Sequence, residues 1–177
     1  NRFPLTHIPT HCDGTATDKF RRALSALGRY LSLLIRGRIA LVHVHGASNA
    51  SFRRKFPFIA LAFVCRIPVI YHVHGGGFLQ FHQRSGWLGR TCIRLVLNRS
   101  ARVIAVSDFW LAPLHGIAPH ARIVRIYNPL SDPGLLDLQH VTPAHPSLLF
   151  LGRIDADKGI NELLSAFATV RRSIPDL

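Results

Sequence analysis

Short apolar runs alternate with longer amphipathic segments along the chain. Four runs rich in Val and Ile have the length and composition of buried β-strands: residues 39–45, 68–74, 102–107 and 122–127. Near-continuous apolar strands that alternate with helices are typical of a parallel sheet covered on both faces. The pattern therefore predicts an α/β fold built on a Rossmann-like, doubly wound parallel sheet.

Helices are predicted around these runs at residues 18–36, 51–65, 87–98 and 108–114, and the first is the most regular. Its apolar residues recur at helical spacing: Phe20, Leu24, Leu27, Leu31 and Leu34. Gly37 follows as a stop signal. We expect the leucine face of this helix to pack on the core, and the segment 79–86 to be a loop.

The composition changes after the fourth run. Residues 129–147 contain a cluster of residues that break regular structure: Pro129, Pro133, Gly134, Pro143 and Pro146. A strand is predicted at 148–151 and a helix at 158–174. We therefore expect one domain over residues 1–128, a linker over 129–147, and the truncated start of a second Rossmann-like domain over 148–177.

Composition and charge narrow the classes of function. Hydrophobic residues make up 48% of the chain, which argues against disorder. The formal net charge of +13 comes almost entirely from arginine and suggests an anionic partner, although a solvated arginine-rich surface has the same composition. The three cysteines are far apart with no C-x-x-C motif, so neither a disulfide framework nor a thiolate zinc site is expected. A reducing, cytoplasmic compartment fits this cysteine usage.

Two histidine pairs, His43/His45 and His72/His74, each end a predicted strand and each precede a glycine. In an open parallel sheet, ligands bind outside the carboxyl ends of the strands. His45 and His74 are therefore candidates for the ligand crevice, whereas His43 and His72 are interpreted as structural histidines. Three glycines after His74 allow the backbone to approach a ligand closely, or else form a simple turn: Gly75, Gly76 and Gly77.

A second candidate site lies at residues 152–159, between a predicted strand and a predicted helix. Arg153 offers a planar fork of donors, Lys158 a point charge, and the helix start a partial positive charge. Together these groups suit a diphosphate. The alternative is a surface loop in which the two cations pair with Asp155 and Asp157.

Five segments, taken in order, carry a resemblance to a known family. Residues 41–46, 69–75, 103–107 and 126–129 resemble successive segments of the acceptor domain of the family-4 retaining glycosyltransferases. Residues 148–167 resemble the opening of the donor domain of the same family. The resemblance covers essentially the whole chain.

The resemblance implies a GT-B enzyme, in which two Rossmann-like domains face each other across a cleft. Its implied reaction transfers a sugar, as a hexosyltransferase does, from a nucleotide-sugar donor to a hydroxyl of a glycan or lipid-linked acceptor, with retention. By this resemblance His74 contacts the sugar from the acceptor side, while Arg153 and Lys158 neutralise the donor diphosphate. It further implies no metal and no other cofactor, because these cations stabilise the leaving charge. Cell-surface polysaccharide or glycolipid synthesis is the expected setting.

The chain departs from that family at both ends. The family's first strand and glycine-containing loop have no counterpart before Asn1. The paired glutamates of the donor domain are missing, because Glu162 is the only glutamate in the sequence. Gly77 stands where many relatives carry a polar or acidic residue. We therefore expect a partial chain that is inactive alone.

Two rival functions differ in class. A metal-dependent hydrolase is the main alternative, because His-x-His on a strand directs both rings to one side, and Asp13 or Asp108 would complete the site. This alternative leaves Arg153 and Lys158 unexplained. A nucleic-acid-binding module is not expected, since no recognised module is present.

An anionic membrane surface is a further expected partner, at the inner face of the membrane. Residues 52–58 mix cations with aromatic residues, as an interfacial element does. The polar face of the first predicted helix adds four arginines: Arg21, Arg22, Arg29 and Arg36. The longest apolar run, residues 56–65, is too short to span a bilayer.

Overall fold

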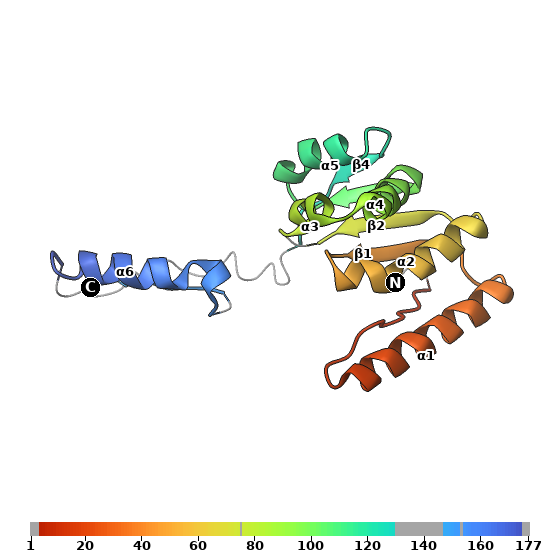
Figure 1. The fold of residues 1–177 in the computed structure, drawn as a ribbon, viewed down its shortest axis with the longest axis horizontal. Coiled ribbons are helices and arrows are strands. Elements are labelled where there is room, and N and C mark those ends of the chain that lie inside the picture. Colours follow the sequence, from red (N-terminus) through yellow and green to blue (C-terminus); the bar gives the residue numbers. More distant parts are fainter. Residues whose placement is uncertain (1–3, 75, 130–146, 153, 175–177) are drawn as a thin grey trace. The chain divides into compact units, whose positions relative to one another are not determined.

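The structure is a computed structural model that describes residues 4–74, 76–129, 147–152 and 154–174. The chain divides into two units, Asn1–Pro129 and Leu130–Leu177, which are treated separately below (Figure 1). Residues 130–146, most of the predicted linker, lie outside the described residues.

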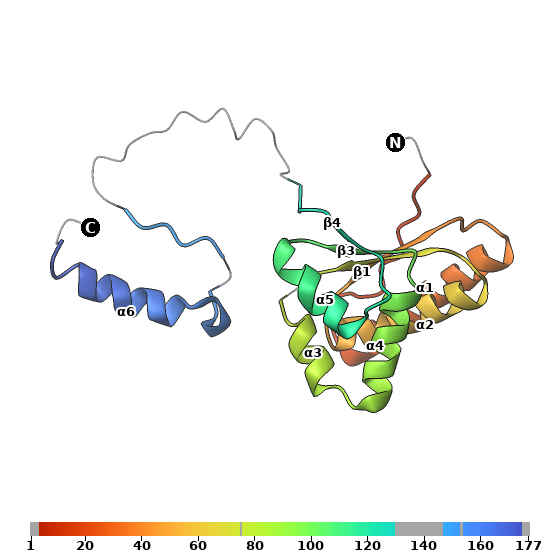
Figure 2. The same ribbon diagram turned by 90° about the horizontal axis from the view of Figure 1, so that it is seen from above.

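The first unit is built on a parallel sheet of four strands. These are β1 (Val42–Gly46), β2 (Val69–Val73), β3 (Arg102–Ala105) and β4 (Ile123–Arg125), in the order β1-β2-β3-β4. Each lies inside or overlaps one predicted run, so the predicted α/β class with a Rossmann-like parallel sheet is confirmed. Sequential order is that of one wing of a doubly wound sheet. Because parallel crossovers are right-handed, a sequential order places the connecting helices on one side, as Figure 2 shows.

The predicted helices of this unit are confirmed, with shifts of a few residues at their ends. They are α1 (Ala16–Ile35), α2 (Ala50–Val64), α4 (Trp87–Arg99), and the pair η1 (Asp108–Trp110) and α5 (Leu111–Ile117). A short helix, α3 (Phe78–Arg84), replaces most of the predicted loop at 79–86. Its few residues follow three glycines and give no sustained periodicity, but Phe78 and Phe81 are buried and fix it to the core.

The core lies between the sheet and the helices α2, α3 and α4. One face of the strands contributes Val44, Tyr71 and Val73, and the helices cover it with residues such as Ile59 and Val96. Tyr71 is fully buried and its ring lies directly against Gly46. A Cβ at Gly46 would come within 2.2 Å of the Tyr71 hydroxyl oxygen, so the end of β1 admits no side chain on this face.

Helix α1 packs through only part of the face that was expected to be buried. Thr15 and Asp18 form a capping box at its start, and Ala26 and Tyr30 are buried against Phe58 of α2. The Tyr30 hydroxyl donates to the carbonyl of Phe58 at 3.0 Å, and burial raises its pKa to about 12. The predicted packing of this face is confirmed for Leu27 and Leu34, which are partly buried against the same cluster. It is wrong for Phe20, Leu24 and Leu31, which are exposed. The contact of the Tyr30 side chain with α2 therefore determines which face of α1 packs.

The prediction of an interfacial element at residues 52–58 is also corrected. Phe52 and Phe58 are buried, because α2 covers the sheet and its aromatic residues fill the core. Among the described residues, no helix has both the length and the apolarity to cross a bilayer.

The second unit contains η3 (Ala156–Lys158) and α6 (Ile160–Val170) in its described part. The helix predicted at 158–174 is thus confirmed, whereas the strand predicted at 148–151 is wrong. Leu148, Leu149 and Leu151 are exposed and irregular. A strand needs a neighbour to pair its N–H and C=O groups, and the described part of this unit offers none.

Gly28 lies inside α1 and Gly37 lies just after its end, so substitutions at the two positions test the backbone conformation of the helix end. Gly37 has φ +63°, and the amides of Gly37 and Arg38 donate to Leu34 and Leu33, which closes the helix with a Schellman motif. Gly28 lies on the exposed surface of α1. A methyl group would meet nothing within 4 Å at either position, so packing does not differ between them.

We expect Gly37→Ala to lower the free energy of unfolding by about 1 kcal/mol, because an L-residue is strained in the left-handed region. The matched variant Gly28→Ala should raise it by about 0.5–1 kcal/mol, because Ala is the better helix former. Urea unfolding followed by circular dichroism measures both. Changes of the same sign in the two variants would contradict this description of the helix end.

Candidate active site

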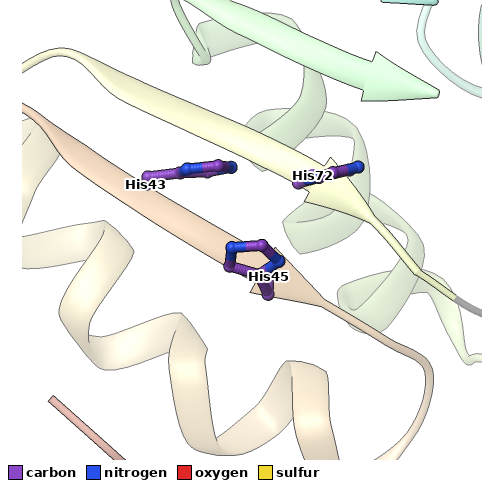
Figure 3. A group of neighbouring side chains, drawn as sticks. All are labelled: His43, His45 and His72. Carbon is purple, nitrogen blue, oxygen red and sulfur yellow. The ribbon is translucent and has the colours of Figure 1, made fainter. Parts of the chain in front are cut away.

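The pairing of β1 with β2 brings the two histidine pairs together. His45 lies opposite His72 in the register, and His43 lies two residues earlier on β1. Since Val44, Tyr71 and Val73 face the helices, the alternation of a strand directs His43, His45 and His72 to the opposite face. Figure 3 shows the three rings standing side by side on β1 and β2.

His74, the residue that follows β2, belongs to the same group of rings. Its amide donates to the carbonyl of Gly46 at 2.6 Å, which extends the β1–β2 pairing by one bond. The Nδ1 atom of His45 and the Nε2 atom of His74 are 2.8 Å apart, so one ring donates to the other. The ring centroids of His72 and His74 are 4.0 Å apart. The two histidines predicted for the crevice are therefore in direct contact at the carboxyl end of the sheet.

The histidine cluster is defined as His43, His45, His72 and His74, and the pKa of three of these rings is lowered. Burial and the neighbouring imidazoles His74, His45 and His43 lower the pKa of His72 to about 4. Burial, followed by the influence of His45, also lowers the pKa of His43 and of His74. Both ring nitrogens of His72 lack a hydrogen-bond partner among the described residues. His72 is therefore not the hydrogen-bonded structural histidine that the sequence suggested, and His43 is exposed.

Lys55 of α2 fixes the backbone beneath the cluster. Its Nζ atom donates to the carbonyl of His45 at 2.5 Å and to the hydroxyl of Ser51 at 3.0 Å. Burial, and then the charge of Arg54, lower the pKa of this ammonium. Sequence reasoning missed this role, because a lysine in a basic, apolar helix carries no signal of the strand that it reaches.

A second polar network lies beyond β3 and β4. Asp108 accepts from Arg125 at 2.5 Å and from the Tyr127 hydroxyl at 3.0 Å. These two hydrogen bonds, with that of Arg125 the stronger, lower the pKa of the carboxyl group. The Arg125 guanidinium also lies 4.9 Å from the ring centroid of Tyr127. Asp108 is thus engaged by an arginine rather than placed beside the histidines as a metal ligand.

The remaining predicted site residues are only partly described. Gly76 is exposed, and Gly77 is the N-terminal cap of α3, while Gly75 lies outside the described residues. Lys158 is exposed at the end of η3, immediately before Gly159, whose φ of +71° opens α6. Arg153 lies outside the described residues, so its predicted convergence with Lys158 stays a prediction.

The comparison with known families supplies the remaining observation. The family model "Glycosyl transferase 4-like domain" matches residues 2–129, which contain the whole sheet and the histidine cluster. The chain belongs to this family. This glycosyltransferase domain therefore coincides with the first structural unit, Asn1–Pro129. No curated protein and no solved structure matches the chain.

The lowered pKa of His72 makes the stability of this glycosyltransferase domain depend on pH. The unfolded chain takes up this proton near pH 6.5, whereas the folded chain takes it up only near pH 4. Between these two values the unfolded state binds more protons, so the free energy of unfolding falls as the pH is lowered through that window. Above the window, this group contributes no pH dependence.

We expect His72→Leu to flatten the loss of stability between pH 6.5 and about 4, because the variant has no imidazole to protonate. His115→Leu, a change at an exposed histidine of α5, is the matched control and should leave the slope unchanged. Urea unfolding at a series of pH values, in the presence of a chelator, measures the slope. An equal slope in wild type and His72→Leu would contradict the assignment.

Proposed function

We propose that this glycosyltransferase domain supplies the acceptor side of a sugar transfer from a nucleotide-sugar donor to an acceptor hydroxyl, with retention. The contact between His45 and His74 at the carboxyl ends of β1 and β2 carries this proposal. This edge is where open parallel sheets bind their ligands. His74 is the residue proposed to contact the transferred sugar, and the glycines that follow it in the sequence, Gly75, Gly76 and Gly77, are proposed to take part in the same contact.

The state of the His74 ring supports this role. A ring whose pKa is lowered by burial is neutral near pH 7, and so offers both a donor and an acceptor to sugar hydroxyl groups. His45 occupies one of its nitrogens and thereby sets its orientation. Lys55 in turn holds the backbone of His45. A preorganised donor of this kind stabilises charge that develops in a transition state.

The donor diphosphate is assigned to Arg153 and Lys158. Lys158 stands in front of the N-terminus of α6, where a helix favours negative charge. The reaction is proposed to proceed without a metal, because two cations and a helix start neutralise the leaving group. The same chemistry makes a sugar nucleotide, rather than an uncharged sugar, the expected donor.

A groove between α2, α3 and α4 supports an amphiphilic, anionic acceptor such as a lipid-linked sugar in polysaccharide or glycolipid synthesis. Its lining combines aromatic and aliphatic side chains with two arginines: Phe52, Phe56, Phe81, Leu88, Arg53 and Arg84. An apolar floor with cations suits a hydrophobic tail next to a phosphate. Asn49, which precedes α2 and follows the end of β1 by three residues, also lines the groove.

The test of the proposed function is the variant His74→Ala in the natural protein that carries this chain. Transfer from a panel of sugar nucleotides to lipid acceptors should fall by at least about 100-fold, because a positioned transition-state contact is removed. His115→Ala, an exposed histidine far along the chain, should retain wild-type rates. Wild-type transfer by His74→Ala would remove the role assigned to this residue, and the absence of transfer from any sugar nucleotide would refute the function.

We further propose that α1, rather than residues 52–58, contacts an anionic membrane surface at the inner face of the membrane. Phe20, Leu24, Leu31 and Ile35 form an exposed apolar stripe along one face of α1. Exposed cations border the stripe on one side: Arg21, Arg22 and Arg29. An apolar stripe beside arginines is the arrangement of an interfacial helix, and the net charge of +13 favours anionic lipid.

We expect the protein to float with vesicles that contain phosphatidylglycerol at low salt, but not with vesicles of phosphatidylcholine alone. The double variant Leu24→Ser/Ile35→Ser should partition at least about tenfold more weakly, because apolar area is removed from the contact. Phe109→Ser, a change at an equally exposed apolar residue of η1, is the matched control. Unchanged flotation of the double variant, or a stripe that instead forms a dimer in solution, would contradict the proposal.

A further inference from the structure

The histidine cluster has a geometry that the proposed sugar transfer does not use. His43, His45 and His72 each present a ring nitrogen, and these three nitrogens all lie within 4.8 Å of one another. Their ring centroids are 4.5 Å apart for His43 and His45, 5.6 Å for His43 and His72, and 5.2 Å for His45 and His72. Three imidazoles thus lie next to one another on β1 and β2, as Figure 3 shows.

The β1–β2 pairing produces this convergence. His45 and His72 are register partners on neighbouring strands, and His43 is the next residue on the same face of β1. The Cα atoms of residues at these positions are about 5–7 Å apart, along one strand or across to the next. Histidine side chains can meet over that distance. Two rigid, hydrogen-bonded strands therefore hold the three side chains before any ligand binds.

Each ring offers one nitrogen to an ion, although the Nδ1 atom of His45 also contacts His74. His43 and His45 are exposed, so their side chains can rotate to shorten the separation of the nitrogens. Neither ring nitrogen of His72 has a hydrogen-bond partner among the described residues, although both are shielded from solvent. A buried, unpartnered nitrogen that faces two other imidazoles points to a ligand that accepts its lone pair.

We propose that His43, His45 and His72 form a binding site for one divalent transition-metal ion of the Zn²⁺ type. Imidazole nitrogen suits Zn²⁺, Cu²⁺ and Ni²⁺, whereas Mg²⁺ and Ca²⁺ require oxygen ligands. In a tetrahedral zinc site with Zn–N bonds of about 2.0–2.1 Å, ligand nitrogens are about 3.3 Å apart, so small side-chain rotations complete the site. Three histidines leave the fourth position to water or to His74, whose ring contacts His45.

This site is distinct from the hydrolase considered from the sequence, because it assigns binding and no hydrolytic step. It also goes beyond the proposed sugar transfer, for which no metal is required. Asp108 takes no part, since its carboxylate is held by Arg125 and Tyr127.

The test uses the full chain without a polyhistidine tag, stripped with a chelator and titrated with Zn²⁺ against a chromophoric competitor. One equivalent of Zn²⁺ should bind, and Co²⁺ in its place should give the intense visible absorption of tetrahedral coordination. Mg²⁺ should not compete. His72→Leu and, separately, His43→Gln should weaken Zn²⁺ binding by more than about 100-fold, since each removes a direct ligand.

Two controls make the result specific in a chain with 11 histidines. His115→Gln/His120→Gln and His7→Gln/His11→Gln change histidines outside the cluster and should leave affinity and stoichiometry unchanged. His43 is exposed, so its variant tests the site even where His72→Leu fails to fold. No stoichiometric binding, unchanged binding in His43→Gln, or equal loss in the control variants would each overturn the proposal.

Discussion

The parallel pairing of β1 with β2 is the interaction on which the rest of the structure depends. Its register places His45 opposite His72 and Gly46 opposite Val73. A shift by one residue would move every side chain of β1 to the other face of the sheet. Such a shift would bury the histidines against the helices and expose Val44, so the hydrophobic face opposes it.

The same strand pair serves the core with one face and the candidate site with the other. On the core face, Tyr71 fills the space beside Gly46 and aligns the end of β1 with α2 and α3. On the opposite face, the histidine cluster stands where the two strands end. Lys55 connects the two layers, because it rises from the helix that packs on the core and bonds to the carbonyl of His45. The backbone of the site is thereby bonded to a helix of the core.

The arginines on the described surface lie in three different surroundings. The arginines of α1 border an apolar stripe, whereas Arg53 and Arg84 border a groove, and Arg125 is engaged by Asp108. Of these arginines, only Arg125 forms an ion pair within the described part of the chain, so the others keep their attraction for anions. This distribution of charge supports the proposal of a substrate that combines phosphate with a hydrophobic part.

The sequence by itself determined the alternation of strands and helices, the parallel sheet, and the position of His45 and His74 at strand ends, because periodicity and breakers such as Gly37 act locally. Predictions from the sequence were wrong where the structure depends on contacts with segments far away in the chain. Only the tertiary structure decided that α1 packs through Tyr30 while Leu24 and Leu31 stay exposed, and that Phe78 and Phe81 anchor α3. The same holds for residues 148–151, which find no strand to pair with among the described residues. The convergence of His43, His45 and His72 was likewise decided by register. Register and burial are set by contacts between segments far apart in the chain, and a local pattern carries no record of them.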